Sequence, residues 1–441
     1  MENPLKQIVK IQKEGKAVGI YSCCSANEYV LRAVLERGRQ TSSCVLIEST
    51  ANQCDQYGGY TGMTPEMFRD FVYRLADETG FDRKLLFLGG DHLGPLTFAS
   101  KEESEAMEEA QELIRCYVRA GFTKIHLDTS MRLKGDDPNS RLSDETIAAR
   151  AALLAKTAEE TFRNEVFSRY SDAIEPVYVI GSEVPVPGGQ QAGSKELQIT
   201  DPADFSRMLA VFEETFRKEG LEHAWNNVIA AVVQPGVEER DSGCVEYSRE
   251  KAEAICAAGK ACRTLVLEGH STDYQTRIKL REMVEDGIAV LKVGPALTFA
   301  MREALYALAY CERELYGFRS SNFVEVLDDC MSRHPEYWQK HYTGSEKEIG
   351  LKRKYSFSDR CRYCMPDSEV KAAKDLMLDH LKDGVPLNLL SQFMPIQYRK
   401  VREGTLENKP EALIKDHIGS VIDDYLYATK QELLFGKGER I

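Results

Sequence analysis

The segment LLFLGGDHLGP, residues 85–95, contains the pattern from which the fold of this chain can be predicted. It begins as an apolar run, passes through two glycines, and then places Asp91 and His92 before a further glycine and a proline. An apolar run without polar alternation is typical of a strand buried on both faces of a parallel sheet. The same order of apolar run, polar end and amphipathic helix-like segment recurs along most of the chain, which indicates a fold built from βα units.

Eight such apolar runs occur between residues 16 and 294. They span residues 16–24, 43–49, 85–90, 124–129, 176–182, 228–233, 264–269 and 288–294. Eight consecutive βα units predict an α/β fold, a (β/α)8 TIM-type barrel. The alternative is an open doubly wound sheet, and the absence of a GxGxxG motif after the first run favours the barrel.

Helix signals lie between these runs. Residues 64–80 begin with Thr64 as a cap and Pro65 at the first helical position, and they end at Gly80. After about residue 318 the alternation stops, and the remaining segments have the pattern of helices joined by polar loops. We therefore predict a barrel over residues 1–318 and a helical C-terminal extension over residues 319–441 that packs on it.

Composition restricts the class of protein. The chain has 441 residues, with 57 Lys and Arg against 70 Asp and Glu, so its net charge of −13 argues against nucleic-acid and membrane-surface partners. No segment approaches the roughly 18 consecutive apolar residues of a membrane span, and the N-terminus has no secretory pattern. The 12 cysteines lack regular spacing, which indicates reduced thiols. These features predict a cytoplasmic protein.

Polar residues gather where the predicted strands end, which in a parallel barrel is the edge that carries chemistry. From the third strand to the eighth these residues are Asp91, His92, Asp128, Glu183, Gln234, His270, Ser271, Asp273, Lys292 and Gly294. Such a one-sided accumulation predicts a site at the mouth of the barrel.

Within this group, His92, Glu183 and His270 offer imidazole and carboxylate ligands from three strands. That set suits Zn²⁺, with Mn²⁺, Co²⁺ and Ni²⁺ as alternatives, and leaves a position for substrate. Any one of them alone would be equally typical of a core histidine or a helix cap, so the hypothesis depends on the set. His126 lies on the same strand face as Asp128 and is either an interior polar residue or a partner behind the ligands.

Two segments suit a phosphate group. Ser271, Lys292 and the backbone near Gly294 precede a predicted helix, where barrels often bind phosphate, although a simple tight turn is the alternative. In the extension, YSFSDR (355–360) is predicted to reach over the barrel mouth, with Ser358 and Arg360 as phosphate ligands and an ordinary surface turn as the alternative. The pair Cys361 and Cys364 lacks a second pair for zinc, and no GxxxxGK[ST] loop supports kinase activity.

Eight ordered motifs over almost the whole chain resemble the GatZ/KbaZ family. They are residues 47–65, 88–95 (LGGDHLGP), 126–131 (HLDTSM), 178–189, 232–238 (VVQPGVE), 268–277 (EGHSTDYQTR), 291–305 and 355–360. Its founding members are known as the non-catalytic subunit of class II D-tagatose-bisphosphate aldolase, formerly called tagatose-6-phosphate kinase. Some relatives are described as epimerases that interconvert tagatose and fructose, or their 6-phosphates, at C4. The resemblance implies a ketose or ketose-phosphate ligand, and either a catalytic aldolase subunit or a second copy of the chain as a partner.

A more distant similarity connects the chain to catalytic class II aldolases. Asp91-His92 resembles their strand-end pair, in which the histidine binds zinc and the aspartate transfers protons, and His270-Ser271 resembles a later motif. Gln234 stands where those aldolases have another zinc-binding histidine. The resemblance therefore implies Glu183 as the replacement ligand.

Two functions follow. The first is a metal-dependent 4-epimerase of tagatose and fructose, free or 6-phosphorylated. C4 of a 2-ketose lies β to the carbonyl, so its proton is not acidic, and cleavage and re-formation of the C3–C4 bond is the reasonable route. Asp91, Asp128 and Glu183 would transfer protons. The second function is an accessory subunit that stabilises a class II aldolase, with a barrel site that has lost its activity.

Overall fold

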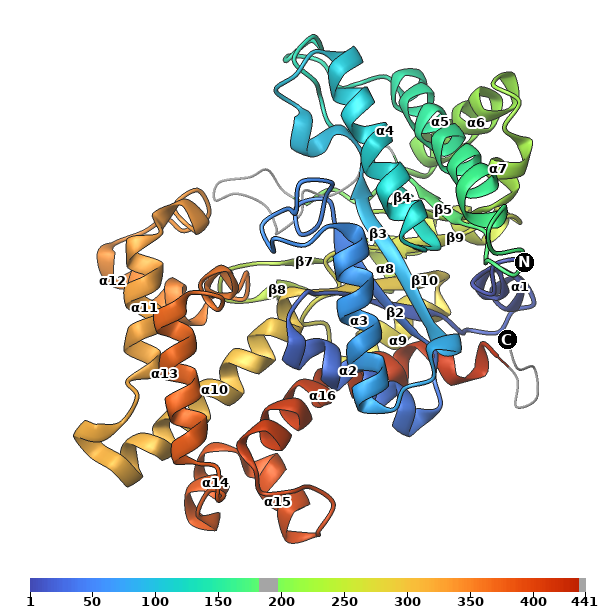
Figure 1. Ribbon diagram of the computed structural model, residues 1–441. Helices are drawn as coiled ribbons and strands as arrows, with labels where there is room; N and C mark the ends of the chain where they lie inside the picture. Colours follow the sequence, from blue (N-terminus) through green and yellow to red (C-terminus); the bar gives the residue numbers. More distant parts are fainter. Residues whose placement is uncertain (182–196, 436–441) are drawn as a thin grey trace.

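The computed structural model describes residues 1–181 and 197–435. Eight parallel strands form a closed barrel in the order β1-β2-β3-β4-β5-β6-β9-β10, and β10 pairs again with β1 (Figure 1). Their bounds are β1 Ile20–Cys24, β2 Val45–Thr50, β3 Leu86–Leu93, β4 Lys124–Leu127, β5 Val177–Ile180, β6 Val228–Val233, β9 Val266–Gly269 and β10 Ile288–Val293. All eight lie within or overlap the predicted apolar runs, so the predicted (β/α)8 fold class is confirmed.

Helices follow the strands and surround the barrel. They are α2 Glu28–Thr41, α3 Pro65–Thr79, α4 Glu103–Arg119, α5 Asp144–Thr161, α6 Pro202–Lys218, α8 Arg249–Ala261, α9 Arg277–Glu285 and α10 Pro295–Tyr316. The predicted signals act as expected in α3: the Thr64 side chain accepts from the Met67 amide, and Gly80 ends the helix with a φ of 68°. Two shorter helices, α1 Lys6–Lys13 and α7 Glu222–Asn226, complete this part.

The C-terminal helices have two different positions. They are α11 Phe323–Arg333, α12 Glu346–Tyr355, α13 Ser368–His380, α14 Leu387–Phe393, α15 Pro395–Arg402 and α16 Pro410–Thr429. Helices α11 to α15 lie to one side of the barrel together with the outer part of α10 (Figure 1). Helix α16 returns to the barrel, where it packs against α2, α9, α10 and strand β1. It therefore occupies the place between α9 and α2 that the helix after the last strand would usually fill.

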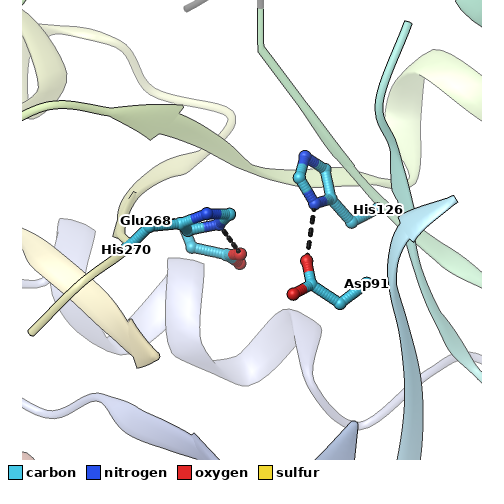
Figure 2. A group of neighbouring side chains, drawn as sticks. All are labelled: Asp91, His126, Glu268 and His270. Carbon is cyan, nitrogen blue, oxygen red and sulfur yellow. Dashed lines mark hydrogen bonds and ion pairs between the residues drawn. The ribbon is translucent and has the colours of Figure 1, made fainter. Parts of the chain in front are cut away.

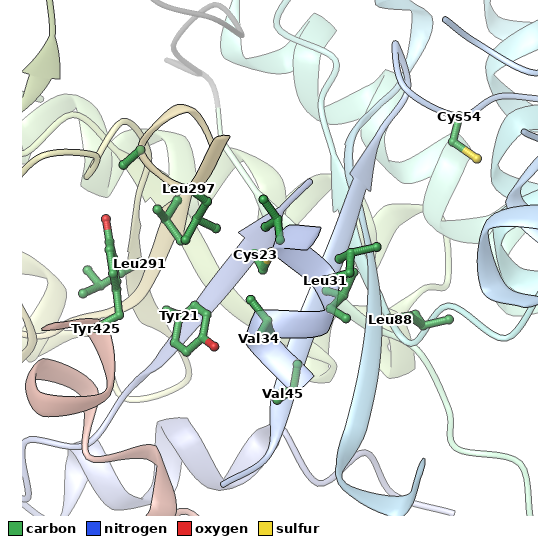
Figure 3. Packing of buried hydrophobic residues seen from close by; sticks show 14 of the residues in the cluster. Tyr21, Cys23, Leu31, Val34, Val45, Cys54, Leu88, Leu291, Leu297 and Tyr425 are labelled. Atoms are coloured by element: carbon green, nitrogen blue, oxygen red, sulfur yellow. The ribbon is translucent and has the colours of Figure 1, made fainter. Parts of the chain in front are cut away.

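Apolar packing joins these layers. Figure 3 shows Tyr21, Leu291 and Tyr425 beside one another between the strands and α16, and the rings of Tyr21 and Tyr425 are 5.7 Å apart. A second apolar cluster fills the N-terminal end of the barrel interior, where Ile20, Leu46, Phe87, Val179 and Val290 are fully or almost fully buried. The interior becomes polar only toward the carboxyl ends of the strands, which leaves one end of the barrel for chemistry.

Three further features bear on the sequence-based expectations. A two-stranded hairpin, β7 Glu238–Glu239 and β8 Cys244–Val245, follows β6 and was not predicted. All 12 cysteines are free thiols, as expected. Within residues 1–181 and 197–435, no helix combines the length and apolar character that a membrane crossing requires.

Candidate active site

A layer of buried charges lies directly above the apolar interior. Lys124 Nζ is 2.6 Å from Glu48 Oε1 and 2.9 Å from Glu268 Oε2, and Lys292 Nζ is 2.8 Å from Glu48 Oε2. Lys292 also contacts Asp91 Oδ1. Burial alone would raise the pKa of Glu48, but the two lysines outweigh it and hold that pKa below its usual value. The layer is therefore ionised and held together by ion pairs.

Three imidazoles stand above this layer in a triangle. The ring centroids of His92, His126 and His270 are 5.2 to 5.3 Å apart. Each ring lies beside a carboxylate: Nδ1 of His92 is 2.7 Å from Asp128, Nδ1 of His126 is 2.8 Å from Asp91, and Nε2 of His270 is 3.0 Å from Glu268. The His92 backbone amide also donates to Nδ1 of His126, at 3.2 Å. Carboxylates that hold a histidine in one tautomer are typical of metal and proton-transfer sites.

Four of these residues could hold a metal ion. The ligand atoms of Asp91, His126, Glu268 and His270 all lie within 4.8 Å of one another, and Figure 2 shows the four side chains facing one another across the barrel interior. Nε2 of His126 is buried and has no hydrogen-bond partner in the described part of the chain. A buried imidazole nitrogen without a hydrogen-bond partner is available to a ligand such as a divalent metal ion.

The charge balance also suits a cation. Four buried carboxylates, Glu48, Asp91, Asp128 and Glu268, face two buried ammonium groups, Lys124 and Lys292. Negative charge therefore remains in excess even when one imidazole is protonated. Buried charge without compensation is unfavourable, and a divalent ion at the nitrogen and oxygen ligands would supply the compensation.

The pKa values of two imidazoles diverge. Burial would lower the pKa of His92, but Asp91 and Asp128 outweigh it, so the pKa is raised. The pKa of His270 is lowered to about 4 by burial and by Lys292. His270 is thus neutral and available as a ligand, whereas His92 readily holds a proton.

His92 occupies an unusual backbone position. Its φ is 50°, and the register between β3 and β4 shifts between Gly90 and Leu93. Strand alternation is therefore broken at this pair, and Asp91 and His92 both line the barrel mouth. A Cβ on Gly94 would lie 1.8 Å from the Asp128 carbonyl oxygen, so a residue without a side chain brings the two strand ends together here.

A cavity of about 550 Å³ opens above these residues. Its walls include Asp91, His92, His270 and Lys292 from the strand ends, together with Ser271, Asp273 and Gly294. Glu239 of the β7–β8 hairpin and Arg362 and Tyr363 of the extension also line it. The volume suits a small polar metabolite.

Two carboxyl groups of the cavity wall have raised pKa values. Burial and the nearby Glu239 raise the pKa of Asp273 to about 7, although its Oδ1 accepts from the amides of Gly294 and Ala296 at 3.0 and 2.8 Å. Burial also raises the pKa of Glu239. A carboxyl group that titrates near neutral pH can donate or accept a proton at the mouth.

The site residues predicted from the sequence differ in where the structure places them. His270 lies in the ligand cluster, while His92 stands beside it and Asp128 lies behind His92, away from the cavity lining. Glu183 falls outside the described residues. Gln234 is not among the cavity residues, because its side-chain oxygen accepts from the amides of Gly236 and Val237.

The segment 355–360 packs against the barrel mouth, as predicted. The Phe357 ring stacks on Tyr274 with 4.1 Å between centroids, and Tyr274 donates to the Phe357 carbonyl. Ser358 and Arg360 nevertheless do not line the cavity, because Ser358 bonds to Tyr342 and Arg360 to His341. Their role as phosphate ligands stays a prediction.

Sequence reasoning missed several residues of the site. His126 was considered only as an interior or supporting residue, and Glu239, Arg362 and Tyr363 were not singled out. Strand alternation with Asp128 was the available signal for His126. No local signal marked the other three, because they reach the cavity through the hairpin and through the folding of the extension.

The chain is similar to several known proteins. Residues 5–430 match the family described as D-tagatose-1,6-bisphosphate aldolase subunit GatZ/KbaZ-like. A crystal structure of a probable tagatose 6 phosphate kinase from Sinorhizobium meliloti 1021 is 41% identical, with a TM-score of 0.84 over 93% of this chain and 100% of that one. The YdjI aldolase from Escherichia coli K12 is 12% identical, with a TM-score of 0.41 over 83% of this chain and 96% of that one. A fructose-bisphosphate aldolase from Campylobacter jejuni is 14% identical, with a TM-score of 0.44 over 86% and 93%.

Proposed function

The chain belongs to the D-tagatose-1,6-bisphosphate aldolase subunit GatZ/KbaZ-like family, and from this premise we propose that it is a metal-dependent 4-epimerase of D-tagatose and D-fructose 6-phosphates. The observation that carries the proposal is the pairing of a four-residue ligand cluster with a carboxylate-oriented His92 at one cavity. An accessory protein needs neither part.

The reaction proceeds by cleavage and re-formation of one bond. A base takes the proton from the C4 hydroxyl, the C3–C4 electron pair moves toward the C2 carbonyl, and an enediolate and an aldehyde result. The aldehyde turns to present its other face, the bond forms again, and the new C4 oxygen recovers the proton. Atoms and electrons balance without an oxidant or a second substrate.

The ligand cluster defines the metal position. Asp91, His126, Glu268 and His270 would hold the ion, and their mixed nitrogen and oxygen donors suit Zn²⁺ or a similar divalent metal. When bound, the ion would supply Lewis-acid polarisation of the substrate carbonyl. Glu183 could add a further ligand, and that role stays a proposal because the residue lies outside the described part.

His92 is suited to proton transfer at the C4 hydroxyl. Asp128 fixes its Nδ1 as the donor, so Nε2 is the nitrogen that can exchange a proton with a ligand in the cavity. Asp91 is less suited to this role than the sequence suggested, because its Oδ1 contacts His126 and Lys292 and its Oδ2 lies 3.6 Å from Nε2 of His92. Lys292 lines the same cavity and can balance negative charge on the enediolate.

One experiment tests the proposal directly. The purified protein with fructose 6-phosphate and Zn²⁺ or Mn²⁺ should form tagatose 6-phosphate. In D₂O the product should carry no deuterium at C4, because the C4–H bond is never broken. Deuterium at C4 would exclude bond cleavage as the route, and no product from any ketose phosphate would exclude the epimerase.

The family description favours a second candidate, an accessory subunit of class II D-tagatose-1,6-bisphosphate aldolase. In that case the chain alone should be inactive, and it should bind a catalytic aldolase subunit and raise its thermal midpoint. Kinase activity is not proposed, because the sequence contains no GxxxxGK[ST] loop.

A further inference from the structure

Arg362 places a guanidinium group at the cavity without a carboxylate partner. Its Nη1 donates to the carbonyls of Ser358 and Asp359 at 2.6 and 3.0 Å, and its Nη2 donates to the Tyr363 hydroxyl at 3.0 Å. Among residues 1–181 and 197–435, no carboxylate lies within ion-pair distance of it. Arginine in such surroundings is usually paired, so this one has capacity for an anion.

Arg302, unlike Arg362, forms an ion pair with a carboxylate. Arg302 is 2% exposed and pairs with Asp359 Oδ1 at 3.0 Å, while Thr298 donates to the other oxygen of the same carboxylate at 2.6 Å. The carboxylate nearest in sequence to Arg362 is therefore already occupied. In a chain with a net charge of −13, a cavity-lining arginine left in this way is not accounted for by structural pairing.

Arg362 shifts the pKa values of two neighbouring side chains. The pKa of His341 is lowered to about 4 by burial, by Arg360 and by Arg362. The pKa of Tyr363 is also lowered, first by Arg362. Both shifts have the direction expected beside a cationic group.

The usual alternative position for an anion is already filled by the protein. Helix α10 begins at Pro295 beside the cavity, but its N-terminal amides at Gly294 and Ala296 donate to Asp273. That carboxyl group satisfies the amides that would otherwise bind phosphate. An anionic group of a ligand is thus directed away from the helix and toward the extension.

Arg362 is held in place before any ligand binds. The preceding loop is anchored by Phe357 on Tyr274 and by Asp359 on α10, and the guanidinium lies 4.6 Å from the Tyr363 ring centroid. A fixed guanidinium loses little conformational freedom when it binds an anion. The cavity is lined by Arg362 and by Asp91 and His270 of the ligand cluster, so one ligand can contact both parts.

We infer that Arg362, assisted by the Tyr363 hydroxyl, binds the phosphate group of the ketose and thereby makes a phosphorylated sugar the substrate. This inference rests on the proposed function for the identity of the sugar. It does not rest on turnover, because recognition of the phosphate can be measured by binding alone. It also assigns the extension a direct part in the site.

The test compares ligands that differ by the phosphate. Calorimetric titrations of the metal-loaded full chain would use fructose 6-phosphate and fructose. The Arg362→Met variant should bind fructose 6-phosphate about 10- to 100-fold more weakly, the usual effect of losing a charged hydrogen bond, and fructose as before. Arg362→Lys should fall between. Arg319→Met, an exposed arginine of the same extension, should change neither affinity.

Several outcomes would overturn the inference. Equal weakening of fructose and fructose 6-phosphate by Arg362→Met would mean that the residue only shapes the cavity. Equal affinity of the unmodified protein for fructose 6-phosphate and for fructose would mean that the cavity does not recognise the phosphate group. If Arg362→Met does not fold, Arg362→Lys and Tyr363→Phe test the inference instead. Each should weaken the binding of fructose 6-phosphate and leave the binding of fructose unchanged. Phosphate-dependent binding without epimerisation would leave the inference standing and remove the proposed activity.

Discussion

Lys124 lies inside the barrel between Glu48 and Glu268, and it is 1% exposed. Replacing it with methionine would leave two buried carboxylates with less compensation, so Lys124→Met should lower the free energy of unfolding by about 3–5 kcal/mol. Urea denaturation measures this. Lys134→Met is the matched control, because Lys134 pairs with Glu102 at 2.9 Å on the surface and should matter by less than about 1 kcal/mol. Equal effects would show that the buried layer is not ion-paired.

Substitutions of His126 and of His92 should have different effects on metal binding and on turnover. His126→Ala removes a direct ligand, so it should weaken metal binding by more than the about 10- to 100-fold expected for an outer-shell partner. His92→Ala should retain the metal while turnover falls by about 10²-fold or more. Competition with a chelator measures the metal affinity, and steady-state assays measure the turnover. Loss of metal from His92→Ala would restore the ligand role that the sequence suggested for it.

Asp273 should make stability depend on pH. Its pKa is raised from 3.8 to about 7 in the folded protein, so the folded state binds more protons between these values and its stability falls as pH rises through them. In Asp273→Asn the amide oxygen can still accept from Gly294 and Ala296, but nothing titrates. Between pH 5 and pH 8 the unmodified protein should lose on the order of 1–4 kcal/mol relative to the variant. If the urea midpoints of the unmodified protein and of Asp273→Asn change with pH in the same way across this range, the pKa of Asp273 is not raised.

Individual site residues could be predicted only in part. Asp91 and His270 can be predicted because they follow apolar runs, and Lys292 because it lies near the end of the last run, since strand ends meet in a barrel. His126 was undervalued because a histidine inside a strand is equally typical of a core residue. Arg362 was missed because Arg360, two residues earlier, has the same local sequence signal, and only the folded loop decides which of them lines the cavity.

At the scale of elements, the long and regular pieces were predictable. Each barrel strand carries an apolar run, and α3 shows its cap and its terminal glycine in the sequence. The β7–β8 hairpin was not predictable, since strands of two residues have no periodicity. The replacement of α10 by α16 in the ring depends on contacts between distant segments, which a local pattern does not contain.

Gly94 tests how closely two of these elements must approach. A methyl group there would collide with the Asp128 carbonyl and move the strand end that positions His92. Gly94→Ala should therefore lower stability by about 1–3 kcal/mol or more and reduce turnover. Gly243→Ala, at a site with nothing within 4 Å, should leave both unchanged. Urea midpoints and kcat provide the comparison, and a fully active Gly94→Ala would show that β3 and β4 tolerate separation.

At the scale of the whole molecule, the extension is joined to the barrel by α16. Gln431, just after this helix, donates to the Cys44 carbonyl and accepts from the Tyr21 amide, and Gly19 donates to the Thr429 carbonyl. The C-terminal segment thus bonds to residues just before or within β1 and β2. The predicted boundary between residues 318 and 319 stays a prediction, but these contacts imply that the parts on either side of it unfold together.

The two tryptophans allow that coupling to be measured. Trp225 lies in α7 on the barrel and Trp338 in the extension, so Trp338→Phe and Trp225→Phe each leave one reporter. Both variants should show the same urea midpoint, as one cooperative unit requires.

Ile422→Ala, which removes a fully buried side chain of α16, should lower the free energy of unfolding by about 2–5 kcal/mol and shift the midpoint seen by each tryptophan equally. Tyr427→Ala, on the exposed side of α16, should shift both by less than about 1 kcal/mol. Separate transitions, or a shift confined to Trp338, would show that the barrel folds without the extension, and the phosphate site at Arg362 would then be formed by docking of two independent units.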